Sequence, residues 1–367
     1  MATKIMVPHY LKNIRQNTTR FLGCQQSLIQ PGYYRYSLSG DLYSEADGWG
    51  LGATVYASKI QYILNSNLDS GFVMRWNSFI NTFAASFGEY YDRLVLRKSL
   101  QGRVKYSIKT FDFNNLFGQQ YRRAETRRAW EAFCYLGTRP RVNYLLLPNT
   151  QTEIQRYMSA LDWGHPWGAA SHVNHLLFFL SASAHYFSQS NNDCLDYISS
   201  MLSEINSVTD GSWYVGGNIS RREKINSAMK ICMGLRTARI KGISYPERLI
   251  DLCLDEGLSS DACSNINSLY VLSSCLNISR HRKVEAQGFA SDALAHFESF
   301  YFPVVGGFSF YKGHAADFYY GTRVTKSLPE PDVHGTAMYL WGITIAGEIL
   351  GITGDLGLRS PLGAWQL

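Results

Sequence analysis

Apolar side chains recur at steps of three and four residues over most of the chain. This spacing places them on one face of an α-helix. No segment shows a convincing run of the alternating positions that indicate strands. The pattern therefore predicts an all-α protein, with helices over residues 10–22, 49–64, 73–88, 119–136, 168–188, 225–240, 246–256, 265–276, 283–302 and 333–350.

The loops between these helices repeatedly carry glycine next to an aromatic residue, at 32–33, 48–49, 211–213 and 307–308. Five helices expected to be inner ones start near residues 50, 168, 225, 265 and 335, and the first gap has room for two helix pairs. This is a loose internal repeat of helical hairpins. We therefore expect residues 1–367 to form one domain, a single (α/α)6 toroid of inner and outer helices around a central cavity.

Composition agrees with a well-buried globular protein. Of the 367 residues, 46% are hydrophobic and 17% are charged, which is enough to bury a large core. No stretch reaches the roughly 18 uninterrupted apolar residues of a membrane-spanning helix, and residues 1–8 lack the apolar core of a signal peptide. Seven cysteines without close paired spacing indicate buried, reduced thiols. These features together predict a cytoplasmic protein.

The net charge of +6 is concentrated in the basic segment, residues 89–148, which holds twelve Lys or Arg against five Asp or Glu. Arg122, Arg123, Arg127 and Arg128 fall on one predicted helix. A solvated helix face is the plainer interpretation of such a run. The functional alternative is a site for an anionic partner: a diphosphate, an anionic glycan, or the headgroups of an anionic membrane surface contacted peripherally. Nucleic acid is not expected, because no recognised binding module accompanies the charge.

Four polar clusters lie at or near predicted inner helices, whose N-terminal turns carry partial positive charge and free N–H groups. We expect them to meet at one end of the cavity, where converging polar groups define a default active site. The candidate catalytic residues are Asp332, His334, Asp210, His172 and His175. The candidate substrate-binding residues are Trp49, Trp163, Trp167, Trp213, Tyr214, Phe308, Phe310, Tyr320, Arg323, Thr336 and Trp341. Asn226 with Lys230 makes the fourth cluster.

Each cluster also has a structural interpretation. Asp332 is a plausible helix cap, and Asp210 is a plausible turn residue with Trp213 as a packing anchor. His172 and His175 stand three residues apart on one helix face, which suits a pair of metal ligands. No Glu-x-x-His context surrounds them, so we predict no metal and no cofactor, although a divalent cation could accompany a diphosphate substrate. Asp332 orienting His334 for acid–base chemistry is the functional alternative.

Residues 332–338 read DVHGTAM, which resembles the Asp-x-Asp-Asp-Thr-Ala segment of class II terpenoid cyclases. The same stretch is similar to the Asp-x-x-His-Thr segment of protein prenyltransferase β-subunits. Residues 210–214, DGSWY, resemble the end of the QW repeats in triterpene cyclases, and 306–310, GGFSF, resemble turns between toroid helices. Both families are α/α toroids around an apolar cavity. The resemblance, which covers roughly the second half of the chain, implies that fold here.

The chain departs from both families where their chemistry lies. In the cyclases the middle aspartate of the segment protonates an alkene or epoxide, but the matching residue here is His334, followed by Gly335. An imidazolium with a pKa of about 6.5 is a weaker acid than a carboxylic acid near about 4. In the prenyltransferases a histidine binds zinc with Asp and Cys. Gly335 occupies that position and the Asp-x-Cys partner is absent, so a protein prenyltransferase is disfavoured.

Three hypotheses follow. The first, which leads through the resemblance, is a terpenoid cyclase-like enzyme that folds a polyprenyl or polyprenyl diphosphate substrate in an aromatic-lined cavity. The second is a carbohydrate-active toroid (a lyase, epimerase or hydrolase) of surface-polysaccharide metabolism, because the Asp-x-His-Gly-Thr ending also looks like that of toroid proteins of surface-polysaccharide gene sets. The third is a binding or scaffold toroid without activity. A sealed apolar cavity would favour the isoprenoid, and an open groove rimmed with Tyr, Asp and His would favour the sugar.

Overall fold

A computed structural model describes residues 7–110, 113, 115–259 and 261–361. Residues 1–6, most of the stretch in which we expected no signal peptide, lie outside the described residues. The described chain is predominantly helical, as the apolar pattern predicts. Its buried hydrophobic side chains form one continuous cluster that extends from Tyr10 to Leu358.

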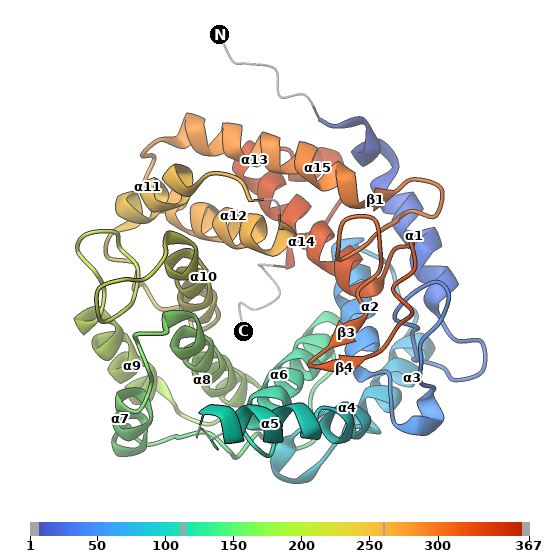
Figure 1. The fold of residues 1–367 in the computed structure, drawn as a ribbon, viewed down its shortest axis with the longest axis horizontal. Coiled ribbons are helices and arrows are strands. Elements are labelled where there is room, and N and C mark those ends of the chain that lie inside the picture. The colour runs from blue at the N-terminus through green and yellow to red at the C-terminus, as the bar shows by residue number, and fades with distance from the viewer. Residues whose placement is uncertain (1–6, 111–112, 114, 260, 362–367) are drawn as a thin grey trace.

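Six helices contact one another in a closed cycle. In order around the cycle, α2 packs on α6, α6 on α8, α8 on α10, α10 on α12, α12 on α14, and α14 on α2. Figure 1 shows these helices arranged around the centre of the molecule. They are α2 (Leu51–Ile63), α6 (Gln119–Tyr135), α8 (Pro166–Phe187), α10 (Arg221–Thr237), α12 (Ala262–Leu276) and α14 (Val333–Leu350).

The remaining α-helices precede, link or, in the case of α15, follow the six inner ones, and most lie outside them in Figure 1. In chain order, one or more outer helices come before each inner helix, so the chain alternates between the two layers. They are α1 (Ile14–Gln25), α3 (Ser70–Asn81), α4 (Arg93–Lys98), α5 (Leu100–Thr110), α7 (Gln151–Ser159), α9 (Asn192–Glu204), α11 (Pro246–Glu256), α13 (Lys283–Phe297) and α15 (Thr353–Leu356). Short 3-10 turns cover His9–Asn13, Glu45–Asp47, Ser86–Gly88 and Glu298–Phe300.

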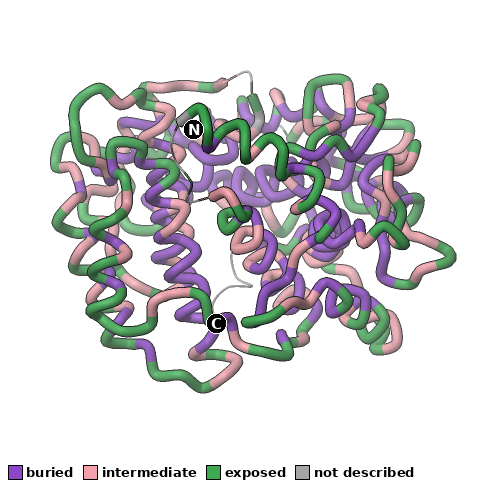
Figure 2. The backbone as a smooth tube through the Cα atoms, turned by 60° about the horizontal axis from the view of Figure 1, so that its bottom comes forward, coloured by how far each residue is buried: buried purple, intermediate pink, exposed green. Residues whose placement is uncertain are grey.

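Side-chain chemistry explains which helices are inner. Nearly every residue of α14 is buried, and its sequence is apolar or small on all sides, as expected of a helix enclosed by protein. By contrast, α11 buries one stripe formed by Leu249, Ile250, Leu252 and Cys253 and exposes its polar face. Figure 2 shows the same contrast along the backbone, with buried positions concentrated on the inner helices.

A loop between α13 and α14 carries two short antiparallel hairpins that the apolar pattern did not predict. In the first, β1 (Tyr301–Phe302) pairs with β2 (Gly307–Phe308). In the second, β3 (Phe318–Tyr319) pairs with β4 (Thr322–Arg323). Gly306 turns the first hairpin at φ +90°, and a Cβ there would lie 2.1 Å from a backbone oxygen of α1. The loop therefore packs tightly against the start of the chain.

Several predicted boundaries were wrong. The helix expected over 73–88 is α3, which ends at Asn81, because the following chain bridges Ala84 to Tyr90 and Phe87 takes a positive φ of 61°. The helix expected over 283–302 ends at Phe297, where the chain leads into β1. Helices α4, α5, α7 and α9 were not assigned individual ranges from the sequence.

Candidate functional site

All six inner helices contribute side chains to one central cavity of about 280 Å³. The cavity wall mixes aromatic, charged and thioether groups. It is lined by Val55, Tyr56, Lys59, Arg127, Arg128, Glu131, Tyr135, Trp167, Met229, Lys230, Met233, Thr237, Cys263, Asn267, Tyr270, Phe310, His334, Met338, Trp341 and Pro361. Because they come from helices far apart in the sequence, closure of the helix cycle assembles this site.

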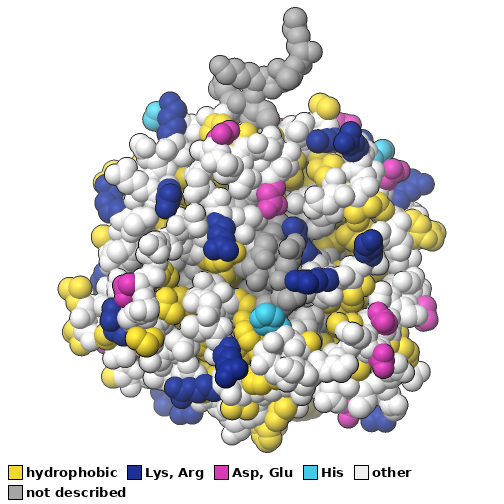
Figure 3. Space-filling model, turned by 180° about the vertical axis from the view of Figure 1, so that it is seen from behind, with side chains coloured by type: hydrophobic (Ala, Val, Ile, Leu, Met, Phe, Trp, Pro, Cys, Tyr) yellow, Lys and Arg dark blue, Asp and Glu magenta, His cyan; other side chains and the backbone are white. Residues whose placement is uncertain are grey.

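The central cavity is strongly cationic. Among the residues that the structure describes, four cations line it, against the single carboxylate of Glu131, which forms an ion pair with Arg127. Lys59 and Lys230 have neither a hydrogen bond nor an ion pair within the described part of the chain. Lys and Arg side chains also lie around the middle of the face shown in Figure 3. Buried charge without a counter-charge is costly, so this wall suits an anionic ligand.

The two cavity lysines are perturbed by this setting. Burial, which disfavours the charged amine, lowers the pKa of Lys59 from 10.5 to about 7 and that of Lys230 to about 8. The positive charges of Arg127 and Arg128 act in the same direction on both lysines. Near neutral pH, Lys59 therefore exchanges a proton easily, whereas an ordinary lysine would remain charged.

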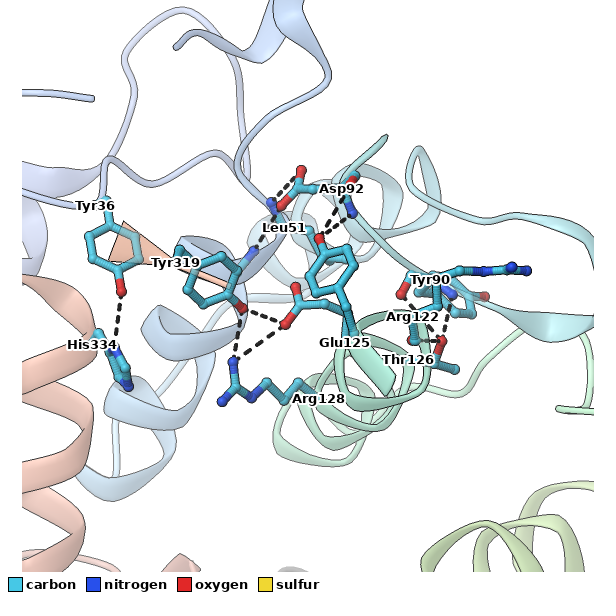
Figure 4. Close-up of polar contacts among 12 residues, drawn as sticks. Tyr36, Leu51, Tyr90, Asp92, Arg122, Glu125, Thr126, Arg128, Tyr319 and His334 are labelled. Carbon is cyan, nitrogen blue, oxygen red and sulfur yellow. Dashed lines mark hydrogen bonds and ion pairs between the residues drawn. The ribbon is translucent and has the colours of Figure 1, made fainter. Parts of the chain in front are cut away.

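His334 is held rigidly at the start of α14 and lines the central cavity. Its ring stacks between Tyr56, with centroids 4.4 Å apart, and Phe310, with centroids 4.3 Å apart. Its Nδ1 lies 2.9 Å from the hydroxyl oxygen of Tyr36, as Figure 4 shows. Burial, followed by the charges of Arg128 and Lys59, keeps the pKa of His334 well below its usual value. The imidazole is therefore neutral at physiological pH.

The expectation that Asp332 pairs with His334 was wrong. One carboxylate oxygen of Asp332 accepts the N–H of Gly335 at 2.7 Å, and the other accepts those of Phe310 at 2.8 Å and Ala316 at 3.0 Å. Asp332 is completely buried and lines neither cavity described here. It caps α14 and fastens the loop that precedes it. The hydroxyl of Tyr36, and not the Asp332 carboxylate, is the partner of His334 Nδ1.

Gly335, the residue after His334, packs directly against the loop that follows β2. A Cβ at this position would lie 2.3 Å from the backbone nitrogen of Phe310. The space beside Gly335 is thus filled by the loop after β2 and is not left open for a substrate atom. The close approach brings Phe310 onto the face of His334.

Arg128 is held in place from behind the cavity wall. Tyr319 donates a short hydrogen bond to Glu125 Oε1, and Arg128 lies 3.4 Å from the same oxygen. Arg128 also lies over the rings of Tyr56, Tyr319 and Tyr320, at 5.1, 5.8 and 5.4 Å from their centroids. Figure 4 shows the contacts among Tyr319, Glu125 and Arg128, which join the second hairpin to α6. Burial raises the pKa of Glu125, whereas the positive charge of Arg128 lowers it.

A second cavity, of about 400 Å³, adjoins the first, since Trp167 and Lys230 line both. The predicted residues His172, His175 and Tyr320 line it as well. His172 Nδ1 lies 2.9 Å from the Tyr157 hydroxyl and 3.1 Å from an Arg123 nitrogen. Burial, with the Arg123 charge adding to it, lowers the pKa of His172 to about 4. Both histidines are therefore neutral, and the sequence correctly placed them on one helix face.

The predicted residues divide clearly by location. Those that line one or both cavities are His334, His172, His175, Trp167, Phe310, Tyr320 and Trp341. Those that line neither are Asp332, Asp210, Trp49, Trp163, Trp213, Tyr214, Phe308, Arg323 and Thr336.

The second group has visible structural roles. Asp210 accepts hydrogen bonds from Ser212 and Tyr214 and forms an ion pair with Lys224 at 2.8 Å, as its turn interpretation suggests. Thr336 hydrogen-bonds both backbone groups of Phe308. Trp49 donates to Asp41 at 2.7 Å. Trp163, Trp213 and Phe308 are buried, while Arg323 is exposed on β4.

Sequence reasoning missed the most informative cavity residue, Lys59. A signal was present, since Lys59 is the one charged residue in the otherwise apolar or polar-uncharged stretch 51–63. The four arginines of the predicted basic helix do not share one role. Arg123, Arg127 and Arg128 line the cavities, whereas Arg122 forms an ion pair with Glu89. Tyr56 and Glu131 carried no sequence motif.

Comparisons with models of protein families, with curated proteins and with solved structures returned no match for this chain. Among the residues that the structure describes, no group of three or more His, Cys, Asp or Glu is arranged to hold a metal ion. Within the same residues, no helix is both long and apolar enough to cross a membrane.

Proposed function

We propose that the helix cycle is an (α/α)6 toroid and that the protein is a carbohydrate-active enzyme acting on a glycan with acidic sugars. The observation that carries this proposal is the convergence of Lys59, Arg127, Arg128 and Lys230 on one cavity, where the described residues supply a single lining carboxylate. Carboxylates are matched by guanidinium and ammonium groups. The aromatic rings of Tyr56, Phe310 and Trp341 in the same wall suit the apolar faces of sugar rings.

The chemistry that fits best is removal of the proton on the carbon next to a uronate carboxylate. Cations that neutralise the carboxylate make that proton more acidic, and a neutral base must then accept it. His334 is a neutral imidazole in a fixed orientation, and no hydrogen bond of its Nε2 occurs within the described chain. With its Nδ1–H donated to Tyr36, Nε2 would be the proton acceptor. Elimination of the glycosidic oxygen, or return of a proton to the other face, would complete a lyase or epimerase reaction.

The same wall supports the other enzymatic alternatives less well. Glycoside hydrolysis commonly uses two carboxyl groups that flank the bond, whereas Glu131 is the one carboxylate that lines either cavity within the described residues. Protonation of an alkene requires a strong acid over the cavity. Asp332, the matching aspartate of the terpenoid cyclase resemblance, has both oxygens bonded to backbone N–H groups. His334 is neutral and cannot replace it.

An isoprenoid diphosphate is a second candidate ligand, favoured by one specific observation. Met229, Met233 and Met338 line the central cavity beside its cations. Methionine side chains adapt to apolar chains of irregular shape, and the lysines would bind the diphosphate. This candidate keeps the anion site but changes the substrate.

Calorimetric titration distinguishes these proposals. Uronic-acid oligosaccharides, the matched neutral oligosaccharides and a polyprenyl diphosphate are titrated into the protein and into Lys59→Gln. Lys241→Gln, at an exposed position lining neither cavity, is the control. We expect the uronic oligosaccharide alone to bind, with affinity lost in Lys59→Gln and kept in the control. Binding of the polyprenyl diphosphate alone would replace the glycan with the isoprenoid, and binding of neither ligand would contradict both.

A further inference from the structure

The second cavity contains positive charge that no lining carboxylate balances within the described part of the chain. Arg103, Arg123 and Lys230 line it, and its lining includes no Asp or Glu. Arg103 donates to the backbone oxygens of Leu116 at 3.0 Å and Leu96 at 2.8 Å. Arg123 donates to the Tyr157 hydroxyl and faces His172. These partners satisfy hydrogen bonds but leave the charges uncompensated.

A buried imidazole in the same wall points independently to a ligand. His175 is 8% exposed, and its Nδ1 has no hydrogen-bond partner among the described residues. Buried polar groups in folded proteins almost always have a partner. Burial, with the charges of Arg127, Arg123 and Lys230, holds the pKa of His175 well below its usual range. The neutral ring adds one N–H donor and one acceptor to a wall whose other groups are mainly cations and hydroxyls.

Backbone dipoles favour the same sign of ligand. The first turn of α8, with Trp167 and Gly168, and the first turns of α6, with Gln120 and Arg123, line this cavity. The N–H groups of Gln120 and Gly168 are already bonded, to Asn115 Oδ1 at 3.0 Å and to the His165 carbonyl oxygen at 3.1 Å. These helix N-termini therefore favour an anion through their partial positive charge. Both helices are long, at 22 and 17 residues.

The two cavities are contiguous. Trp167 and Lys230 belong to both walls, and Trp167 is 51% exposed. A broad indole face at the junction suits a sugar ring that lies across it. Lys230 can reach an anionic group on either side of that junction.

From these observations we infer that the second cavity is an additional anionic subsite, so that the substrate is a chain of at least two acidic sugar residues spanning both cavities. This inference rests on the proposed function for the glycan, but the anion site itself does not. One acidic residue binds at Lys59, Arg127 and Arg128, and the next binds at Arg123 and His175 beyond Trp167.

The test measures how affinity depends on the length of the ligand and on the charge of the two cavity walls. Hexuronic acid oligosaccharides of one, two and four residues are titrated into the protein, Arg123→Gln, Ser171→Asp and Lys59→Gln, with the exposed Arg156→Gln as the matched control. Ser171→Asp adds a carboxylate to the second cavity wall without removing a hydrogen bond that the structure contains. It therefore tests the same site independently if Arg123→Gln does not fold.

We expect affinity to rise about ten- to a hundredfold from one residue to four, as one additional hydrogen bond to a charged group would predict. Arg123→Gln and Ser171→Asp should abolish that gain and leave the single-residue affinity unchanged. Lys59→Gln should weaken all lengths equally. A length gain that survives in both second-cavity variants overturns the inference.

Inorganic phosphate separates failure of this inference from failure of the proposed function. If no uronic acid binds at any length, the glycan proposal fails, and so does the acidic-sugar substrate. Phosphate binding that is lost in Arg123→Gln and Ser171→Asp but retained in Lys59→Gln would then still establish the second anion site. Phosphate binding that is unchanged in the second-cavity variants would overturn that site as well.

Discussion

The Nζ atom of Lys59 lies 3.7 Å from the centre of the Trp341 ring, across the contact between α2 and α14. The indole face attracts the charged form of the amine, while burial disfavours it. Burial, with the charges of Arg127 and Arg128 acting in the same direction, lowers the pKa of Lys59 to about 7. The pair thus places an amine that titrates near neutral pH at the centre of the helix cycle, at a cost to stability that a core residue would not impose.

We predict that Lys59→Met stabilises the protein while removing anion binding. Methionine keeps the contact with Trp341 and removes a desolvated charge. The free energy of unfolding at pH 7 should rise by about 1–3 kcal/mol, the scale seen when buried ionic groups become apolar. Urea unfolding measures this, with Lys241→Met as the control. A destabilised variant would show that Lys59 has a favourable partner after all.

Comparison with Lys59→Met should also show whether the stability of the original protein rises or falls with pH. Between pH 7 and 10.5 the unfolded chain holds a proton on Lys59 that the folded chain has released. Stability of the original protein therefore rises with pH in this window, relative to Lys59→Met. The stability difference between the two should be largest at and below pH 7 and should vanish near pH 10.5. A difference that stays constant over this range would contradict a lowered pKa.

Anion binding should take up protons. A bound anion favours the charged amines of Lys59 and Lys230, whose pKa values in the free protein are about 7 and 8. At pH 8, the protein should therefore take up close to one proton or more for each acidic oligosaccharide that it binds. Calorimetry in buffers of different ionisation enthalpy measures this number. Uptake should fall towards zero at pH 6, where both amines are already protonated.

A structural feature could be predicted from the sequence when it depends only on residues close together in the chain. The inner helices follow from apolar spacing, because α14 must be buried on all sides whatever surrounds it. The placement of His172 and His175 on one face needs only helix geometry. The partner of His334 could not be predicted in this way, because Tyr36 is 298 residues away and reaches it only when the cycle closes.

Asp332 illustrates the opposite limit. Its segment predicted a cap, and the structure has that cap, but two of its three hydrogen bonds come from Phe310 and Ala316 in the preceding loop. Loop geometry of this kind leaves no periodic signal. From the sequence alone, the Asp332 carboxylate is expected to be available for chemistry, because the loop N–H groups that donate hydrogen bonds to it cannot be recognised there.

Asp332→Ala should therefore be strongly destabilising. It leaves three buried N–H groups without an acceptor, and each such loss costs about 1–3 kcal/mol, so we expect at least about 3 kcal/mol in total. Asp69→Ala, which removes the exposed cap of α3, is the control and should cost about 1 kcal/mol. Asp332→Asn should also destabilise, because its amide nitrogen cannot accept. An Asn variant that is stable but inactive would support a chemical role for Asp332 instead.

Gly335→Ala should test the contact that places Phe310 on His334. The added Cβ would lie 2.3 Å from the Phe310 nitrogen and 2.5 Å from the Ser309 carbonyl carbon, so the loop must move. We expect a loss of about 1–3 kcal/mol from overpacking, with weaker ligand binding. Gly288→Ala in α13 has open space and should be neutral or stabilising by up to about 1 kcal/mol. Equal effects of the two substitutions would show that the loop yields freely.

The last prediction concerns His334 as the base. His334→Gln should leave folding and oligosaccharide affinity intact while lowering turnover by about 100-fold or more, the usual contribution of a positioned base. Turnover is followed as the absorbance of a double bond conjugated to the carboxylate, or as solvent deuterium entering the sugar. Tyr36→Phe removes the hydroxyl that fixes the ring and should lower kcat with KM unchanged. The direction in which kcat changes with pH distinguishes a base from an acid. A base whose pKa lies well below 6.5 stays active as the pH falls through 6.5, so kcat at saturating substrate should remain flat there. An acid role for His334 requires the opposite, a kcat that increases as the pH is lowered through 6.5.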